Sequence, residues 1–118
     1  MRRHPDFVSF SREHHDPLRL GRHLLAGGGR EELARLMPAM LAHFREEERS
    51  LLPRLASQGA PELAGRLLRE HEALRALFES ALRGAHLAEA GQALIDHVRF
   101  EERVLFPFLE AQLEAAEP

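Results

Sequence analysis

The chain has 118 residues, a formal net charge of −3 and no cysteine. The slight negative charge argues against a nucleic-acid-binding protein, which would carry a concentrated basic face, and the absence of cysteine excludes disulfides and thiolate metal sites. Because no apolar run approaches the roughly 20 residues of a membrane span and the N-terminus lacks the apolar core of a signal peptide, we expect a cytoplasmic protein without a membrane partner.

The N-terminal part is predicted to be an arm followed by a helix. Residues 1–10 are expected to form an irregular arm whose aromatic side chains pack against the rest. A first helix is predicted at about 12–26, where apolar residues recur at helical spacing before a run of three glycines. Pro17 leaves the start of this helix open. Either Asp16 caps a helix that begins at Pro17, or the helix begins earlier and bends at the proline.

Three further amphipathic helices are predicted at about 31–56, 62–83 and 86–113, because apolar residues recur there every three or four positions. Pro38 predicts a kink or a short leading helix within the first of these segments. No strand-like alternation occurs. Four such segments with short connections predict an all-α, antiparallel up-down-up-down four-helix bundle, with residues 1–118 forming a single domain.

One sequence motif occurs twice, in residues 43–55 and 97–109. The two copies share a histidine, an arginine, two glutamates, a second arginine, a leucine, a proline and a final leucine. In each copy a glutamate follows the histidine by four residues. The pairs are His43 with Glu47 and His97 with Glu101. Residues four apart lie on the same face of an α-helix, so each imidazole and carboxylate could bind one metal ion together.

The first and third predicted helices each offer one inward-facing histidine. His15 and His71 are both followed by leucine at the third position and arginine at the fourth. An Arg-Glu-His match to the residues before His71 would favour His14 instead, and helical phase does not separate the two alternatives. We take His15. The predicted metal ligands are His15, His43, Glu47, His71, His97 and Glu101.

This ligand set predicts a site for two metal ions. One zinc ion would be saturated by four ligands, so six ligands indicate two ions. Imidazole and carboxylate donors with positions left for water or a small gas suit iron or manganese, and bridging carboxylates would offset the repulsion between two cations. Metal-bound imidazoles also need acceptors for their second ring nitrogen. Nearby candidates for this role are Glu13, Glu48, Glu70 and Glu102.

On these motifs the sequence resembles the hemerythrin-like, or HHE cation-binding, domain family over about residues 11–113. The motifs are a first-helix histidine, His-Phe-x-x-Glu-Glu-x-x-Leu-x-Pro, Glu-His-x-x-Leu and a second His-x-x-x-Glu-Glu. The resemblance implies a hemerythrin-like bundle with a non-heme di-iron centre and an oxo or hydroxo bridge, in which manganese or zinc could replace iron. By it, Glu47 and Glu101 would bridge the ions, the four histidines would be terminal ligands, and O2 or a related small molecule would bind at a vacant position.

The chain departs from the oxygen-carrying hemerythrins at two positions. They have a second histidine on the third helix where this chain has Arg75, and arginine cannot bind a metal. They have an aspartate on the fourth helix where this chain has Glu102, with Glu101 one position earlier. These departures resemble bacterial and regulatory members of the family. They favour sensing, storage or scavenging over reversible O2 carriage, and they predict an open ligand position near Arg75.

Three alternatives remain beside this interpretation. The same centre could act as an oxidoreductase on peroxide, O2 or NO, although we favour a binding or sensing protein over an enzyme. An HD-type metal phosphohydrolase would use His15 and Asp16 but needs a distal aspartate, for which Asp96 is a poor candidate. A metal-free interaction bundle would leave the repeated His-x-x-x-Glu pairs unexplained. We expect a monomer or homodimer, and the redox partner is not identified.

Overall fold

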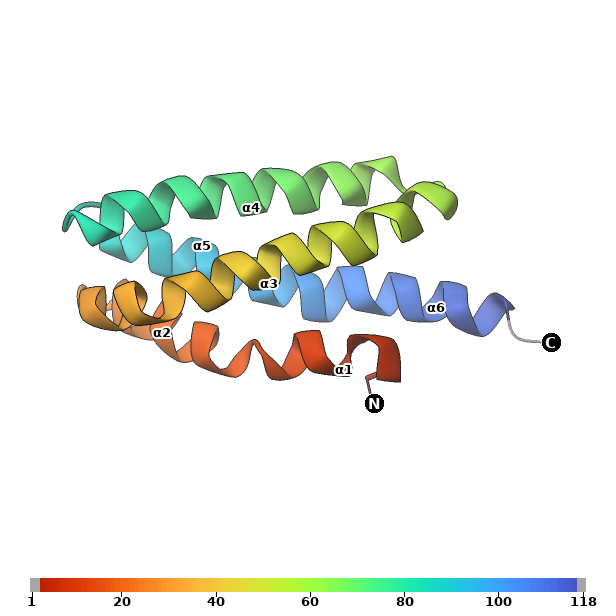
Figure 1. Cartoon of the computed structure of the whole chain (residues 1–118), viewed down its shortest axis with the longest axis horizontal. Coiled ribbons are helices and arrows are strands. Elements are labelled where there is room, and N and C mark those ends of the chain that lie inside the picture. The colour runs from red at the N-terminus through yellow and green to blue at the C-terminus, as the bar shows by residue number, and fades with distance from the viewer. Residues whose placement is uncertain (1–2, 117–118) are drawn as a thin grey trace.

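The computed structural model describes residues 3–116 as an elongated helical bundle (Figure 1). The helices are α1 (Pro5–Arg12), α2 (His15–Leu25), α3 (Arg30–Ser57), α4 (Pro61–Leu82), α5 (Leu87–Phe100), the π-helical turn η1 (Glu101–Leu105) and α6 (Phe106–Ala116). They form the four segments of the bundle, which we call arms. The first arm is α1 followed by α2, the second is α3, the third is α4, and the fourth is α5 followed by η1 and α6.

Consecutive arms run in opposite directions, and the bundle measures 52 × 26 × 20 Å (Figure 1). The described residues contain no β-strand, so the predicted all-α, antiparallel up-down-up-down fold is confirmed. Among these residues, no helix is long and apolar enough to cross a membrane.

Helix α1 corrects the expectation of an irregular arm for residues 5–10, and residues 1–2 of that arm lie outside the described residues. Pro5 occupies the start of the helix, where its missing N–H costs no hydrogen bond, and the imidazole of His4 accepts a hydrogen bond from a backbone N–H of the first turn at 3.0 Å. Phe7 and Phe10 are buried in the core. Burial of each ring contributes about 2 kcal/mol, which favours docking of this short helix on the bundle.

The first arm is interrupted at Glu13 and His14, so the single helix predicted at 12–26 is two helices. A continuous helix would need an N–H at Pro17 to bond to the carbonyl of Glu13, and the proline ring would crowd that carbonyl. With the break in place, Pro17 lies in the first turn of α2, where no such bond is required.

Helix α3 is undivided at Pro38, where a kink or a short leading helix was predicted. Proline removes the hydrogen bond to the carbonyl of Ala34. Both residues are exposed, so water can satisfy this carbonyl and the helix continues.

Polar residues divide the hydrophobic core into two halves. One half contains Phe7, Phe10, Leu51, Leu55, Ala60, Leu67, Phe100, Leu105, Phe106 and Leu109. The other contains Leu20, Leu24, Leu33, Met40, Phe44, Leu74, Phe78, Ala81, Ala90 and Leu94. On α3, the buried Glu47 lies between members of the two halves, and on α4 the buried His71 does the same. The polar residues therefore meet in mid-bundle with apolar layers on both sides.

Helices α2 and α5 cross closely at two glycines. A Cβ atom added at Gly91 would lie 2.5 Å from the carbonyl oxygen of Gly21 and would also collide with the backbone nitrogen of Leu25. We expect Gly91→Ala to lower the free energy of unfolding by about 3 kcal/mol, because a backbone cannot move aside as a side chain can. Urea unfolding of the metal-free protein measures this change.

Gly65 is the matched control for this substitution. A Cβ atom there would meet the end of the Arg69 side chain, at 3.0 Å from Nη1, and that side chain is free to move. Gly65→Ala is expected to be neutral or to stabilise the protein by up to about 1 kcal/mol, because alanine is the better helix former. Equal destabilisation by both substitutions would contradict the close crossing of α2 and α5.

Candidate metal centre

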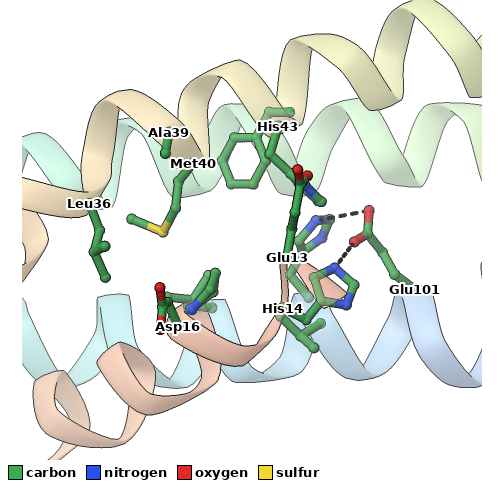
Figure 2. Close-up of a pocket in the computed structure, with 13 residues that line it drawn as sticks. Glu13, His14, Asp16, Leu36, Ala39, Met40, His43 and Glu101 are labelled. Atoms are coloured by element: carbon green, nitrogen blue, oxygen red, sulfur yellow. Dashed lines mark hydrogen bonds and ion pairs between the residues drawn. The ribbon is translucent and has the colours of Figure 1, made fainter. Parts of the chain in front are cut away.

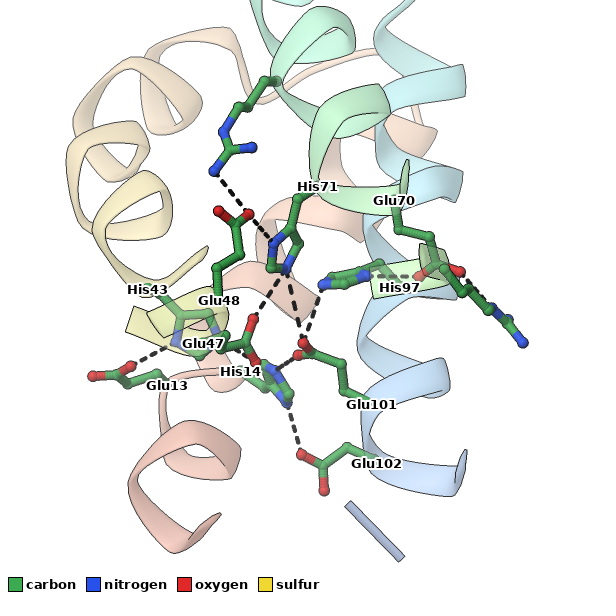
Figure 3. A network of polar contacts seen from close by, with 12 residues as sticks. Glu13, His14, His43, Glu47, Glu48, Glu70, His71, His97, Glu101 and Glu102 are labelled. Atoms are coloured by element: carbon green, nitrogen blue, oxygen red, sulfur yellow. Dashed lines mark hydrogen bonds and ion pairs between the residues drawn. The ribbon is translucent and has the colours of Figure 1, made fainter. Parts of the chain in front are cut away.

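Six side chains from all four arms converge in mid-bundle (Figure 3). They are His14 between α1 and α2, His43 and Glu47 on α3, His71 on α4, His97 on α5 and Glu101 on η1. The side chains of Glu47, His71 and Glu101 are fully buried, and that of His43 is 10% exposed. Five of the six predicted ligands therefore lie together, and the sixth position is held by a different histidine.

The structure places His14, and not the predicted His15, in the cluster. The Nε2 atom of His14 lies 2.7 Å from Oε1 of Glu101, whereas His15 is exposed on α2. The match that favoured His15 compared only the leucine and arginine that follow each histidine. Because the chain breaks just before α2, its helical phase does not extend back to His14. The Arg-Glu-His match to the residues before His71 carried the better signal.

These side chains form two overlapping groups, each of which could hold a metal ion. One group contains His14, His43, Glu47 and Glu101, and the other contains Glu47, His71, His97 and Glu101. Within each group the donor atoms all lie within 4.8 Å of one another. Glu47 and Glu101 belong to both groups, so two imidazoles lie on each side of a shared pair of carboxylates.

Each of the four imidazoles also contacts a second glutamate through its outer nitrogen, Nδ1 (Figure 3). The pairs are His14 with Glu102, His43 with Glu13, His71 with Glu48 and His97 with Glu70, at 2.6–2.7 Å. These are the four glutamates that the sequence suggested for this role. An ionised carboxylate only accepts hydrogen bonds, so each Nδ1 donates its proton. In a neutral ring, the inner nitrogen, Nε2, then offers its lone pair to the cluster.

Four buried atoms of the cluster have no hydrogen-bond partner among the described residues: Nε2 of His43, Oε2 of Glu47, Nε2 of His97 and Oε2 of Glu101. They face each other in pairs, at 3.1 Å for His43 with Glu47 and at 3.3 Å for His97 with Glu101. Two facing lone pairs are unfavourable unless a proton or cation lies between them. Ligand atoms at right angles around a metal, with bonds of about 2.1 Å, lie about 3 Å apart. The residues present therefore fit a pair of metal ions.

Without metal, the cluster contains strongly perturbed acids and bases. Burial, reinforced by the charge of Glu101, raises the pKa of Glu47 well above its ordinary value. Burial opposes ionisation of His97, but the carboxylates of Glu101 and Glu70 outweigh it and raise its pKa to about 9. Burial and the neighbouring His97 lower the pKa of His71 to about 4. Protons therefore occupy part of the cluster in the metal-free protein.

A comparison with protein-family models matches residues 7–109 to the hemerythrin HHE cation binding domain. The chain belongs to this family. Neither the curated proteins nor the solved structures gave a match. Membership of the hemerythrin HHE family confirms the resemblance seen in the sequence and implies cation binding by the domain.

The two departures from oxygen-carrying hemerythrins have clear structural roles in this HHE domain. Arg75 lies outside the cluster, where its Nη2 donates to Glu48 at 3.1 Å and so supports the partner of His71. On the same histidine, His71, the ring of Phe44 also stacks, with 4.3 Å between the ring centroids. Glu102 binds the outer nitrogen of His14, while Glu101 on the preceding position enters the cluster.

A cavity of about 180 Å³ adjoins the cluster of six histidine and glutamate side chains (Figure 2). The cluster contributes His14, His43, His97 and Glu101 to its lining, and Asp16 and Pro17 of α2 also line it. Arg75 does not line it. This cavity therefore lies on the α2 side of the cluster, and the open ligand position near Arg75 stays a prediction.

The residues of the HD-type alternative do not assemble into a site. His15 and Asp16 are exposed on α2, and Asp16 lies 3.5 Å from Arg19. Asp96 accepts a hydrogen bond from Gln92 at 2.9 Å and belongs to neither ligand group. This arrangement counts against a phosphohydrolase.

Proposed function

We propose that the protein is a non-heme di-iron protein that binds O2, NO or peroxide in order to sense, store or scavenge it. The observation that carries this proposal is the pair of ligand groups that share Glu47 and Glu101. Each group offers two imidazole nitrogens and carboxylate oxygens, a donor set that suits iron. Iron bound there would supply reversible redox change and vacant positions for a small ligand.

The chain's own residues would perform four tasks at this centre. Glu47 and Glu101 would neutralise two cations from a position between them. The outer glutamates would hold each imidazole in the tautomer that presents Nε2. The two apolar halves of the core would exclude water above and below the centre. The cavity on the α2 side would admit a small molecule.

The proposed ligand binding is tested on protein loaded anaerobically with Fe²⁺ and then exposed separately to O2, NO and peroxide. We expect at least one of them to produce new ligand-to-metal charge-transfer absorption bands, while zinc-loaded protein stays colourless. Bleaching under vacuum would indicate reversible O2 binding, and a persistent spectrum would indicate oxidation. Fully iron-loaded protein whose spectrum responds to none of the three would contradict the proposed ligand class.

Metal loading is expected to release protons. His97, with its pKa raised to about 9, is protonated at pH 7 and must lose that proton before Nε2 can bind a metal. The metal-free protein therefore holds more protons than the loaded protein, and the affinity for Zn²⁺ should rise as the pH increases from 6 to 9. Calorimetric titrations in two buffers with different heats of ionisation count the protons. No release at pH 7 would show that the cluster is already deprotonated.

A further inference from the structure

The cavity beside the cluster is larger than a diatomic ligand requires. Its volume is about 180 Å³. An apolar protein cavity of about 150 Å³ is large enough to bind benzene. By this comparison the cavity can hold an organic molecule of about six to eight non-hydrogen atoms.

The cluster side chains line one end of the cavity, and mainly apolar side chains line the other, together with Asp16 (Figure 2). The polar end consists of the cluster side chains His14, His43, His97 and Glu101. Beyond them the walls are formed by Leu36, Ala39, Met40, Phe44, Leu94 and Val98. Most of the surface that a guest would contact is therefore hydrocarbon, with the unbranched side chain of Met40 able to adapt to its shape.

The charges around the cavity favour a neutral guest. Glu13 and Asp16 line it with side chains that are 57% and 53% exposed, and the buried Glu101 adds a third carboxylate. Among the described residues, no arginine lines the cavity. The imidazoles of His14 and His97, which can carry a positive charge, are each already paired with two carboxylates, so an anion would find no unpaired cation there. The apolar walls would in turn leave most of a cation's charge unsolvated.

From this volume, lining and charge we propose that the cavity binds a small, neutral, mainly apolar organic molecule directly beside the cluster. Binding of this guest does not require the metal centre. Its use as a reactant there rests on the function proposed above. Guest binding in the cavity and the proposed di-iron function can therefore be contradicted independently of each other.

The test uses ¹⁹F NMR of fluorobenzene with the full chain, in its metal-free and its zinc-loaded forms. We expect saturable binding at one site. With the metal-free protein, the anion 4-fluorobenzoate, which has a similar ring, is expected to bind at least about tenfold more weakly because of the surrounding carboxylates. Absence of saturable fluorobenzene binding in both forms would overturn the proposal. Equal or tighter binding of 4-fluorobenzoate by the metal-free protein would overturn the neutral class of the guest.

Two measurements locate the guest within the molecule. The ε-methyl resonance of Met40 should shift on addition of fluorobenzene, whereas that of Met37, which does not line the cavity, should not. Ala39 is exposed at the edge of the cavity, so Ala39→Phe should preserve the fold and weaken binding at least about tenfold by filling the space. Ala34→Phe, at an exposed position of α3 away from the cavity, is the control and should bind normally. Binding that leaves Met40 unchanged would place the guest elsewhere and overturn the proposal.

Discussion

Glu47→Gln is expected to abolish binding of both metal ions while leaving the metal-free protein as stable as before, or more stable. Glu47 belongs to both ligand groups, so its loss affects both sites. Removal of a residue that merely supports a ligand costs about 10–100-fold in affinity, and removal of a shared ligand should cost at least about 100-fold at each site. Without metal, burial raises the pKa of Glu47, so a neutral amide of the same shape removes an unfavourable charge.

Equilibrium dialysis with metal analysis measures the first effect, and urea unfolding in the presence of a chelator measures the second. Glu46→Gln is the matched control, because Glu46 is the preceding residue, is exposed and pairs with Arg49. It should retain both ions. A Glu47→Gln protein that binds two ions with normal affinity would exclude Glu47 as a shared ligand.

His14→Ala is expected to reduce the metal content from two ions per chain to one. His14 belongs to the group with His43, whereas the group with His71 and His97 does not use it. His14→Ala also leaves Glu101 without a contact at 2.7 Å, so some loss of stability is expected with it. Metal analysis after dialysis, together with circular dichroism to confirm folding, measures the effect.

The neighbouring His15 provides the control. It is exposed and belongs to neither ligand group, so His15→Ala should retain two ions. His71→Ala should remove the other ion and thereby show that the two groups act separately. If His15→Ala lost an ion and His14→Ala did not, the assignment of the first ligand from the structure would be wrong.

The features of the cluster that depend on local helical geometry could be predicted from the sequence. His43 with Glu47 and His97 with Glu101 are each separated by one helical turn, so their shared faces follow from the repeat alone. The four outer glutamates could also be predicted. Three of them are adjacent to a predicted ligand, and Glu13 lies two residues before His15. The apolar periodicity of α3 and α4 predicted their ends to within one residue.

The parts that depend on a chain break or on tertiary packing could not be predicted in the same way. The choice between His14 and His15 depends on the interruption of the first arm before Pro17. The helical state of residues 5–12 depends on burial of Phe7 and Phe10 against other arms, although Pro5 was a capping signal in the sequence. The cavity lies between α2, α3 and α5, so its position on the α2 side requires the packed structure.

One chain is expected to hold two metal ions that share Glu47 and Glu101. Anaerobic titration of metal-free protein with Fe²⁺, followed by removal of unbound iron and elemental analysis, tests it most directly. We expect two iron ions per chain, one for each ligand group. A saturated protein with a single ion, or with none, would contradict the dinuclear centre.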